Sequence, residues 1–155
     1  MQDKDVQIRV ARPDDVAEIA ALFADDALGG HGDTTDPQAL PDYLAAFARI
    51  AASPNETLYV AERDGEVVGT FQTMVTTTMT ARGSSSMIIE AVQTRADCRG
   101  QGIGAAMIAF AVERARAEHM RLVQLTSNAA RTDAHRFYAR LGFAPSHLGF
   151  KLKLK

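Results

Sequence analysis

The sequence predicts a mixed α/β protein with one mostly antiparallel sheet and elements in the order β-α-α-β-β-β-α-β-α-β. Apolar residues alternate with a period of two in some segments and recur at helical spacing in others. Asp64-Gly65 separates two apolar runs, which is the strongest short-range signal of a β-hairpin. A glycine-rich turn at residues 100–104 joins an apolar run to a helical segment. The strands on either side of that helix can therefore be parallel.

The N-terminal third is predicted to hold one strand and two helices. Residues 6–11 alternate apolar and polar side chains, as a half-buried strand does. Pro13 suits the first turn of a helix, which is expected to run to about Leu28. Glycine and turn-forming residues at 29–36 predict a loop, and apolar residues at helical spacing over 37–52 predict a second helix.

The rest of the chain is predicted to complete the sheet. Three strands, at residues 57–62, 67–77 and about 84–94, should form an antiparallel meander. Four further elements are expected: a helix at 105–118, a short buried strand at 121–126, a helix at 131–141 closed by Gly142, and a last strand at 148–154.

Length and composition favour a single domain over residues 1–155 of an ordinary globular kind. Apolar residues make up 46% of the chain, which is enough for one sizeable core. The net charge of −2 speaks against a nucleic-acid-binding protein, because such proteins usually carry a basic face. Cys98 is the one cysteine, so an intrachain disulfide is excluded. We see no signal peptide or membrane-length apolar run and expect a cytoplasmic protein.

The segment from Val92 to Gly104 carries the strongest functional signal. Gly100, Gly102 and Gly104 let the backbone come close to a ligand, and Arg99 adds a positive charge. The positive end of the following helix points at the same place, which favours an anion such as a pyrophosphate. The alternative is a tight turn without a ligand.

Two motifs together resemble the GCN5-related N-acetyltransferase (GNAT) superfamily. The first is Arg99-Gly100-Gln101-Gly102-Ile103-Gly104, and the second comprises Asn128, Ala134 and residues 137–143. They lie about thirty residues apart in the expected strand-turn-helix and strand-helix settings, and the family's element order agrees over nearly the whole chain. The glycine spacing differs from the dinucleotide-binding fingerprint, and the Gly-Lys-Ser/Thr of a nucleotide-hydrolysing loop is absent.

This resemblance implies that acetyl-CoA is the cosubstrate and lies where two parallel strands, ending near Thr94 and Ser127, splay apart. The backbone of Val92 and Thr94 would meet the pantetheine arm, and Asn128 would bind its amides. The alternative for Asn128 is a turn or helix cap, and for Arg131, which would reach a phosphate, a solvated position. The implied cofactor contacts are Val92, Gln93, Thr94, Arg99, Gly100, Gln101, Gly102, Ile103, Gly104, Asn128 and Arg131.

Two side chains are candidates for acid-base chemistry. The resemblance places Tyr138 near the CoA sulfur as general acid, whereas the alternative is a helix tyrosine packed beside Phe137. It also makes Glu90 the general base, acting directly or through water. In a regular strand Glu90 shares a face with Val92. The alternative for Glu90 is an ion pair with Arg82 or Arg9.

The loop after the first helix is the candidate acceptor wall. His31 and Asp33 are the proposed substrate contacts, and the local excess of aspartates would favour a cationic amine. A solvated loop explains the same residues. Cys98 has no histidine-carboxylate arrangement in the sequence that would make it a nucleophile, and we expect neither a metal nor any cofactor besides acetyl-CoA.

The function expected is transfer of an acetyl group from acetyl-CoA to a primary amine of a small molecule, by direct attack in a ternary complex. The alternatives are an acetyl-CoA-binding module without transfer and a protein or peptide N-acetyltransferase. We expect no nucleic acid or membrane partner. Alternation in residues 148–154 suits a homodimer, although the lysines there could equally protect a sheet edge in a monomer.

Overall fold

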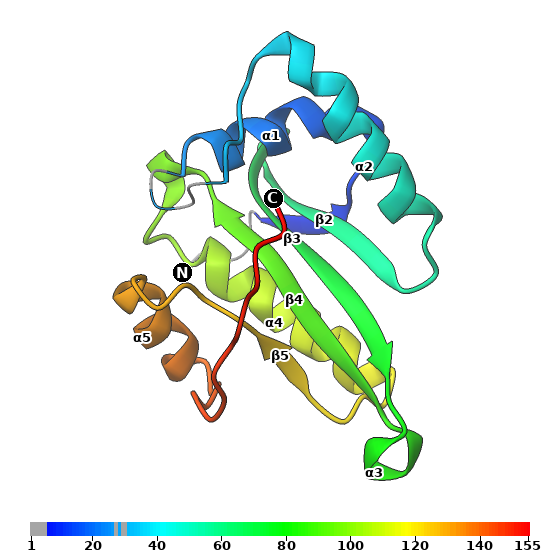
Figure 1. Cartoon of the computed structure of the whole chain (residues 1–155). Coiled ribbons are helices and arrows are strands. Elements are labelled where there is room, and N and C mark those ends of the chain that lie inside the picture. The colour runs from blue at the N-terminus through cyan, green and yellow to red at the C-terminus, as the bar shows by residue number, and fades with distance from the viewer. Residues whose placement is uncertain (1–5, 27, 29–30) are drawn as a thin grey trace.

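Five strands form one mixed sheet in the computed structural model, which describes residues 6–26, 28 and 31–155 (Figure 1). The sheet order follows the chain, and every neighbouring pair is antiparallel except β4 and β5, which are parallel. The predicted fold class is confirmed. The strands are β1 (Gln7–Val10), β2 (Glu56–Arg63), β3 (Glu66–Thr77), β4 (Ser85–Thr94) and β5 (Val123–Leu125).

The helices fall close to the predicted segments, except for a short one at residues 80–83, where the sequence predicted no helix. The first ends at Ala24, four residues before the predicted end, because Asp25 and Asp26 close it in a turn. Residues 1–5 and part of the loop predicted at 29–36, namely residues 29 and 30, lie outside the described residues. The α-helices are α1 (Val16–Ala24), α2 (Leu40–Ala52), α3 (Thr80–Gly83), α4 (Ile103–Ala117) and α5 (Thr132–Arg140), and the 3-10 turns are η2 (Pro13–Asp15), η3 (Pro37–Ala39) and η4 (Ala96–Cys98).

Helices cover both faces of the sheet. In the view of Figure 1, α4 lies behind the sheet, and α1 and α2 lie at its upper end. The α4 layer is the larger core, with Phe71, Ile89 and Met107 among its fully buried members. A smaller core under α1 contains Ile19 and Val60. Burial of these apolar side chains holds the sheet between its helices.

The β2–β3 hairpin turns at the predicted place. Asp64 and Gly65 both have positive φ, at 53° and 79°. Two such residues between paired Arg63 and Glu66 match a type I′ turn, which suits the twist of the strands. The turn therefore fixes the positions of Arg63 and Glu66.

The predicted last strand, at residues 148–154, is wrong. This segment is irregular, and no backbone hydrogen bond joins residues 147–155 to the rest of the described chain. The alternating pattern is present, but a strand needs a neighbour for its peptide groups. Within the described single chain the segment has no such neighbour.

Candidate active site

The C-terminal half of β4 is open on the side of β5. β5 pairs only with Met87–Ile89, although β4 continues to Thr94. Residues 90–94 therefore have β3 on one side and no strand on the other. This is the place where the family resemblance implies that two parallel strands splay.

A β-bulge marks the start of this open segment. In the β3–β4 ladder, Thr70 pairs with Gln93 and Gln72 with Glu90, so β4 carries one extra residue opposite Phe71. Ala91 has a φ of 52°, in the left-handed region. A bulge of this kind interrupts the alternation of side chains and ends regular pairing.

The bulge corrects the predicted direction of Glu90. Val92 packs against the same core cluster as Met87 and Ile89, whereas Glu90 is exposed. The two side chains therefore do not share a face, because the extra residue shifts the alternation between them. Glu90 forms no ion pair within the described residues, with Arg9 or with any other side chain. Its carboxylate is open to solvent.

The glycines of the turn have separate structural reasons. Gly100 and Gly102 have φ of 77° and 84°, which other residues rarely adopt. Gly102 is also the N-cap of α4. Gly104 is helical, and a Cβ there would lie 3.2 Å from Cζ of Phe137. Gly104 therefore allows α5 to pack closely on the first turn of α4.

This turn offers hydrogen-bond donors to a ligand. The backbone N–H groups of Gly100 and Gly102 donate no hydrogen bond within the described chain, and they precede the first turn of α4. Arg99 is exposed and has no ion-pair partner among the described residues. Free amides, a helix N-terminus and an unpaired guanidinium suit an anionic group such as a pyrophosphate.

The β2–β3 hairpin holds this turn from the other side. Arg63 donates from Nη1 to Oε1 of Gln101 at 2.7 Å and from Nη2 to Sγ of buried Cys98 at 3.2 Å. Arg95 bridges Asp97 and Glu66, at 2.7 and 3.1 Å. Sequence reasoning missed Arg63, because nothing near it in the chain indicates a contact 38 residues away.

Tyr138 is half-buried and has aromatic neighbours. Its ring lies edge-to-face against Phe137 and Phe143, with centroids 5.1 and 5.9 Å away. Burial raises the pKa of the phenol, and the charge of Arg131 offsets part of that rise. The hydroxyl makes no hydrogen bond within the described chain. It therefore keeps its proton and has room for another partner.

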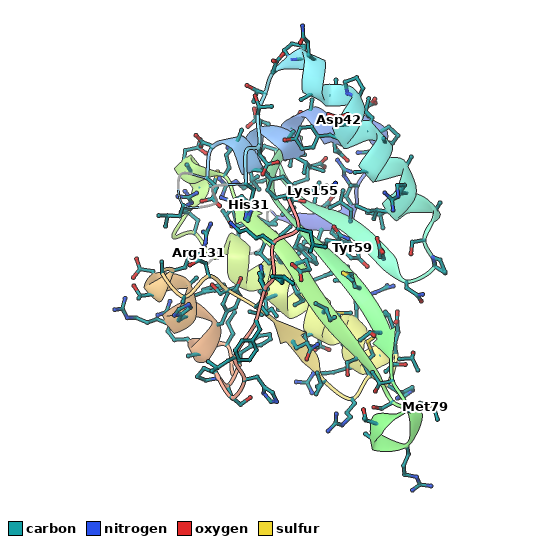
Figure 2. All side chains as sticks on the ribbon, in the orientation of Figure 1. His31, Asp42, Tyr59, Met79, Arg131 and Lys155 are labelled. Carbon is teal, nitrogen blue, oxygen red and sulfur yellow. The ribbon has the colours of Figure 1, made fainter. Side chains whose placement is uncertain are left out.

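Asn128 and Arg131 are already engaged in the fold. Oδ1 of Asn128 accepts from the N–H of Ala130 at 2.9 Å, which is the turn role considered as the alternative. Arg131, labelled beside the start of α5 in Figure 2, donates to Oδ2 of Asp26 at 2.6 Å. This ion pair joins α5 to the turn after α1. The sequence did not predict it, since its partners are 105 residues apart.

The candidate acceptor residues are only partly brought together. His31 is exposed and forms no hydrogen bond or ion pair within the described chain. Asp33 accepts from the hydroxyl of Tyr43 at 2.7 Å, and that hydroxyl accepts from the N–H of Thr34 at 3.2 Å. Burial, followed by the hydrogen bond to Asp33, raises the pKa of Tyr43. Asp33 thus orders the loop on α2.

Two further sequence expectations concern absences. Among the described residues, no group of three or more histidine, cysteine, aspartate or glutamate side chains could hold a metal ion. None of the helices in the described part of the chain is long and apolar enough to cross a membrane.

Comparison with known proteins gives a consistent set of relatives. Residues 16–143 match the family model described as the acetyltransferase (GNAT) family. The aminoalkylphosphonate N-acetyltransferase of Salmonella typhimurium is 37% identical over 115 residues, which cover 70% of this chain and 72% of that protein.

Solved structures agree in fold. A chain described as a transcriptional regulator from Bacillus halodurans C-125 superposes with a TM-score of 0.92 at 38% identity, over 96% of this chain and 99% of that one. A putative acetyltransferase from Agrobacterium tumefaciens superposes with a TM-score of 0.82 at 26% identity, over 95% and 99% of the two chains.

Proposed function

Because this chain belongs to the acetyltransferase (GNAT) family and is an N-acetyltransferase, we propose that it transfers the acetyl group of acetyl-CoA to the primary amine of a small molecule. Direct attack within a ternary complex is the proposed route. The family generally uses acetyl-CoA, and its thioester would supply an activated acetyl group. The cytoplasmic location expected from the sequence stays a prediction.

The observation that carries this proposal is the open edge of β4 leading into the glycine turn. Residues 90–94 have no strand on the β5 side, so their peptide groups there can pair with the amides of a pantetheine arm. The edge ends at a turn whose free N–H groups suit a pyrophosphate. The proposed contacts are those that the resemblance implies, except that Arg131 is held by Asp26 and that Oδ1 of Asn128 is occupied by the N–H of Ala130.

Glu90 is the proposed general base. The attacking amine must lose a proton, and Glu90 lies exposed at the start of the open edge with no competing partner in the described chain. Its position supports this role, because Glu90 points away from the core face that Ile89 and, beyond the bulge, Val92 enter.

Tyr138 is the proposed general acid. The leaving thiolate needs a proton, and a phenol with a raised pKa stays protonated at neutral pH. Cys98 is an unsuitable nucleophile, because only 2% of it is exposed and a substrate cannot reach its sulfur. Direct attack needs no covalent intermediate when both substrates are held in position.

We propose an aminoalkylphosphonate as the first acceptor to test. The Salmonella relative carries that substrate class in its name. The aspartates of the acidic loop are weaker evidence for a simple cationic amine than their number suggests, because three of them already have partners. Asp26 is paired with Arg131, Asp33 holds Tyr43, and Asp36 caps the N–H of Gln38.

A thiol-release assay over a panel of amines tests the function. The panel should contain an aminoalkylphosphonate, the matching amino carboxylate and the matching alkylamine, so that the anionic group is varied alone. We expect acetyl-CoA-dependent turnover with at least one of them. Absence of turnover throughout, together with no calorimetric binding of acetyl-CoA, would refute the proposal.

The role of Glu90 can be tested with Glu90→Gln. General-base removal should lower kcat/KM by about 10²- to 10⁴-fold and flatten the acid limb of the pH profile. Glu113→Gln is the matched control, since Glu113 is exposed on α4 and pairs only with Arg116 in the described chain. An unchanged pH profile in Glu90→Gln would show that Glu90 is not the general base.

A further inference from the structure

An ion pair links α5, which carries Tyr138, to the turn after α1. Nη2 of Arg131 donates to Oδ2 of Asp26 at 2.6 Å, and Figure 2 shows Arg131 between the two elements. Both side chains are sheltered, with 28% of Arg131 and 15% of Asp26 exposed. The ion pairs within α4 and α5 are far more exposed. Water and salt therefore screen the Arg131 charge less than the charges of those pairs.

Arg131 stands where the local structure disfavours a cation. It is the N-cap residue of α5, and its side chain makes no capping hydrogen bond. The positive end of a helix repels a positive charge. Its N–H donates to the carbonyl of Asn128 at 2.9 Å, so the backbone is fixed in this place. A cation kept against the local preference, with a partner 105 residues away, indicates a role beyond the stability of the helix.

Asp26 is held in place by its own surroundings. Oδ1 accepts from the N–H of Leu28 at 3.2 Å, while Oδ2 accepts from Arg131. The N–H of Asp26 donates to the carbonyl of Phe23 at 3.1 Å, at the end of α1. The carboxylate is therefore fixed, and it fixes the guanidinium in turn.

The guanidinium held in this way acts on Tyr138. Residues 131 and 138 are two helical turns apart, so they lie on the same face of α5. Helical side chains lean toward the N-terminus, which brings the phenol toward Arg131. Burial raises the pKa of Tyr138, and the charge of Arg131 offsets part of that rise. The aromatic neighbours of the ring, Phe137 and Phe143, carry no charge.

We propose that Asp26 and Arg131 are positioning residues for the general acid, in which Asp26 holds the guanidinium where it stabilises the phenolate of Tyr138. This rests on the proposed function. Tyr138 donates its hydroxyl proton to the sulfur while the C–S bond breaks and the electron pair of that bond passes to the sulfur. The phenolate then regains a proton from solvent. A cation fixed in advance stabilises this transient negative charge without reorganisation.

This role differs from the phosphate contact that the family resemblance implies for Arg131. A phosphate contact would strengthen the binding of acetyl-CoA. Stabilisation of a developing phenolate instead acts in the transition state alone. The first would change KM for acetyl-CoA, and the second would change kcat.

Steady-state kinetics separate these two roles. Arg131→Gln should lower kcat by about tenfold, a part of the roughly 10²-fold expected for loss of the whole acid, and change KM for acetyl-CoA by less than about twofold. Asp26→Asn keeps an acceptor for Leu28 but removes the charge, so kcat should fall by a smaller factor. The control Arg136→Gln removes an exposed arginine of α5 that pairs with Asp133, and it should match the wild type. An unchanged kcat in Arg131→Gln, or a rise in KM that exceeds the fall in kcat, would overturn the proposal.

Exchange of the two charges separates positioning from a purely structural link. The double variant Asp26→Arg with Arg131→Asp restores an ion pair but places the negative charge on α5. The Tm should recover relative to either single variant, whereas kcat should stay at least as low as in Arg131→Gln. Recovery of kcat together with the Tm would show that the pair only joins the two elements, and the proposal would fail.

A titration of the free protein needs neither turnover nor the exchanged pair. NMR of ring-¹³C-labelled tyrosine follows the three tyrosines separately, and Tyr138→Phe identifies the signal of Tyr138. Arg131→Gln should raise the pKa of Tyr138 further, whereas Arg136→Gln should leave it unchanged. An unmoved Tyr138 in Arg131→Gln would overturn the inference even if the chain is an active acetyltransferase. A shifted Tyr138 in a chain that acetylates no amine would support the effect of the Arg131 charge and refute the proposed function instead.

Discussion

Arg63→Ala should weaken acetyl-CoA binding while leaving the acceptor side unchanged. Arg63 lies at the end of β2 and reaches across to the glycine turn, where it holds Gln101 at 2.7 Å and Cys98 at 3.2 Å. It is not expected to touch the reacting atoms. Its role would be to position a turn whose free amides are proposed to bind the pyrophosphate.

The size of the effect follows from the two contacts. The bond to Gln101 is exposed and worth roughly 0.5–1.5 kcal/mol, and the thiol is a weak acceptor that adds little. At about 1.4 kcal/mol per tenfold change, KM for acetyl-CoA should rise by about two- to twelvefold. Arg63→Lys should be intermediate, because one ammonium cannot replace the fork that spans both partners.

The assay is steady-state kinetics with each substrate varied in turn, together with calorimetric binding of acetyl-CoA. The control is Arg114→Ala, which removes an exposed arginine of α4 that pairs with Glu118. An unchanged KM for acetyl-CoA, or an equal rise in KM for the amine, would refute the reasoning. The first result would show that the turn holds its shape without Arg63, and the second that the whole site had loosened.

Three other substitutions have defined outcomes. Tyr138→Phe keeps the ring contacts, so kcat should fall by about 10²-fold or more with little change in Tm. Because burial raises the pKa of this phenol, deprotonation of Tyr138 should not lower the wild-type rate below about pH 10. Asp15→Asn should lower the free energy of unfolding by about 1–3 kcal/mol at neutral pH, measured with urea. The hydrogen bond from Arg9 holds the pKa of Asp15 below its unfolded value of about 4, so this difference should be full above that pH and vanish as the pH falls further. Gly104→Ala should lower the Tm, because its Cβ would lie 3.2 Å from Cζ of Phe137 and the overpacking, about 1–3 kcal/mol, should exceed the gain of about 1 kcal/mol in helix propensity. A wild-type Tm would contradict that packing.

Local patterns predicted most of the fold. The period of the apolar residues located all five observed strands, and Asp64-Gly65 located the hairpin turn. The glycines of the turn were predictable for a related reason. Positive φ at Gly100 and Gly102 excludes most other residues, so this backbone conformation requires glycine and can be recognised in the sequence.

Contacts between distant segments could not be predicted from local sequence patterns. Arg63 and Gln101, or Asp26 and Arg131, meet only because the sheet and helices bring them together. Each of these residues is ordinary in its local setting. The last strand failed for a different reason, since its pattern is typical of a strand but its partner is not present within the described chain.

The sequence did not predict the bulge in β4, because the residue in the left-handed region is an alanine. Glycine or asparagine would have signalled it, whereas Ala91 at a φ of 52° costs roughly 1–2 kcal/mol and resembles any strand residue. The rest of the sheet holds that conformation, and its consequence is functional. A regular β4 would place Val92 on the exposed face that Glu90 occupies, because Glu90 already points away from the core face of Met87 and Ile89. The bulge returns Val92 to the core, just after the ladder with β5 has ended at Ile89. The strained alanine therefore anchors residues 90–94 in the core, while the peptide groups that we propose for the pantetheine arm have no strand on the β5 side.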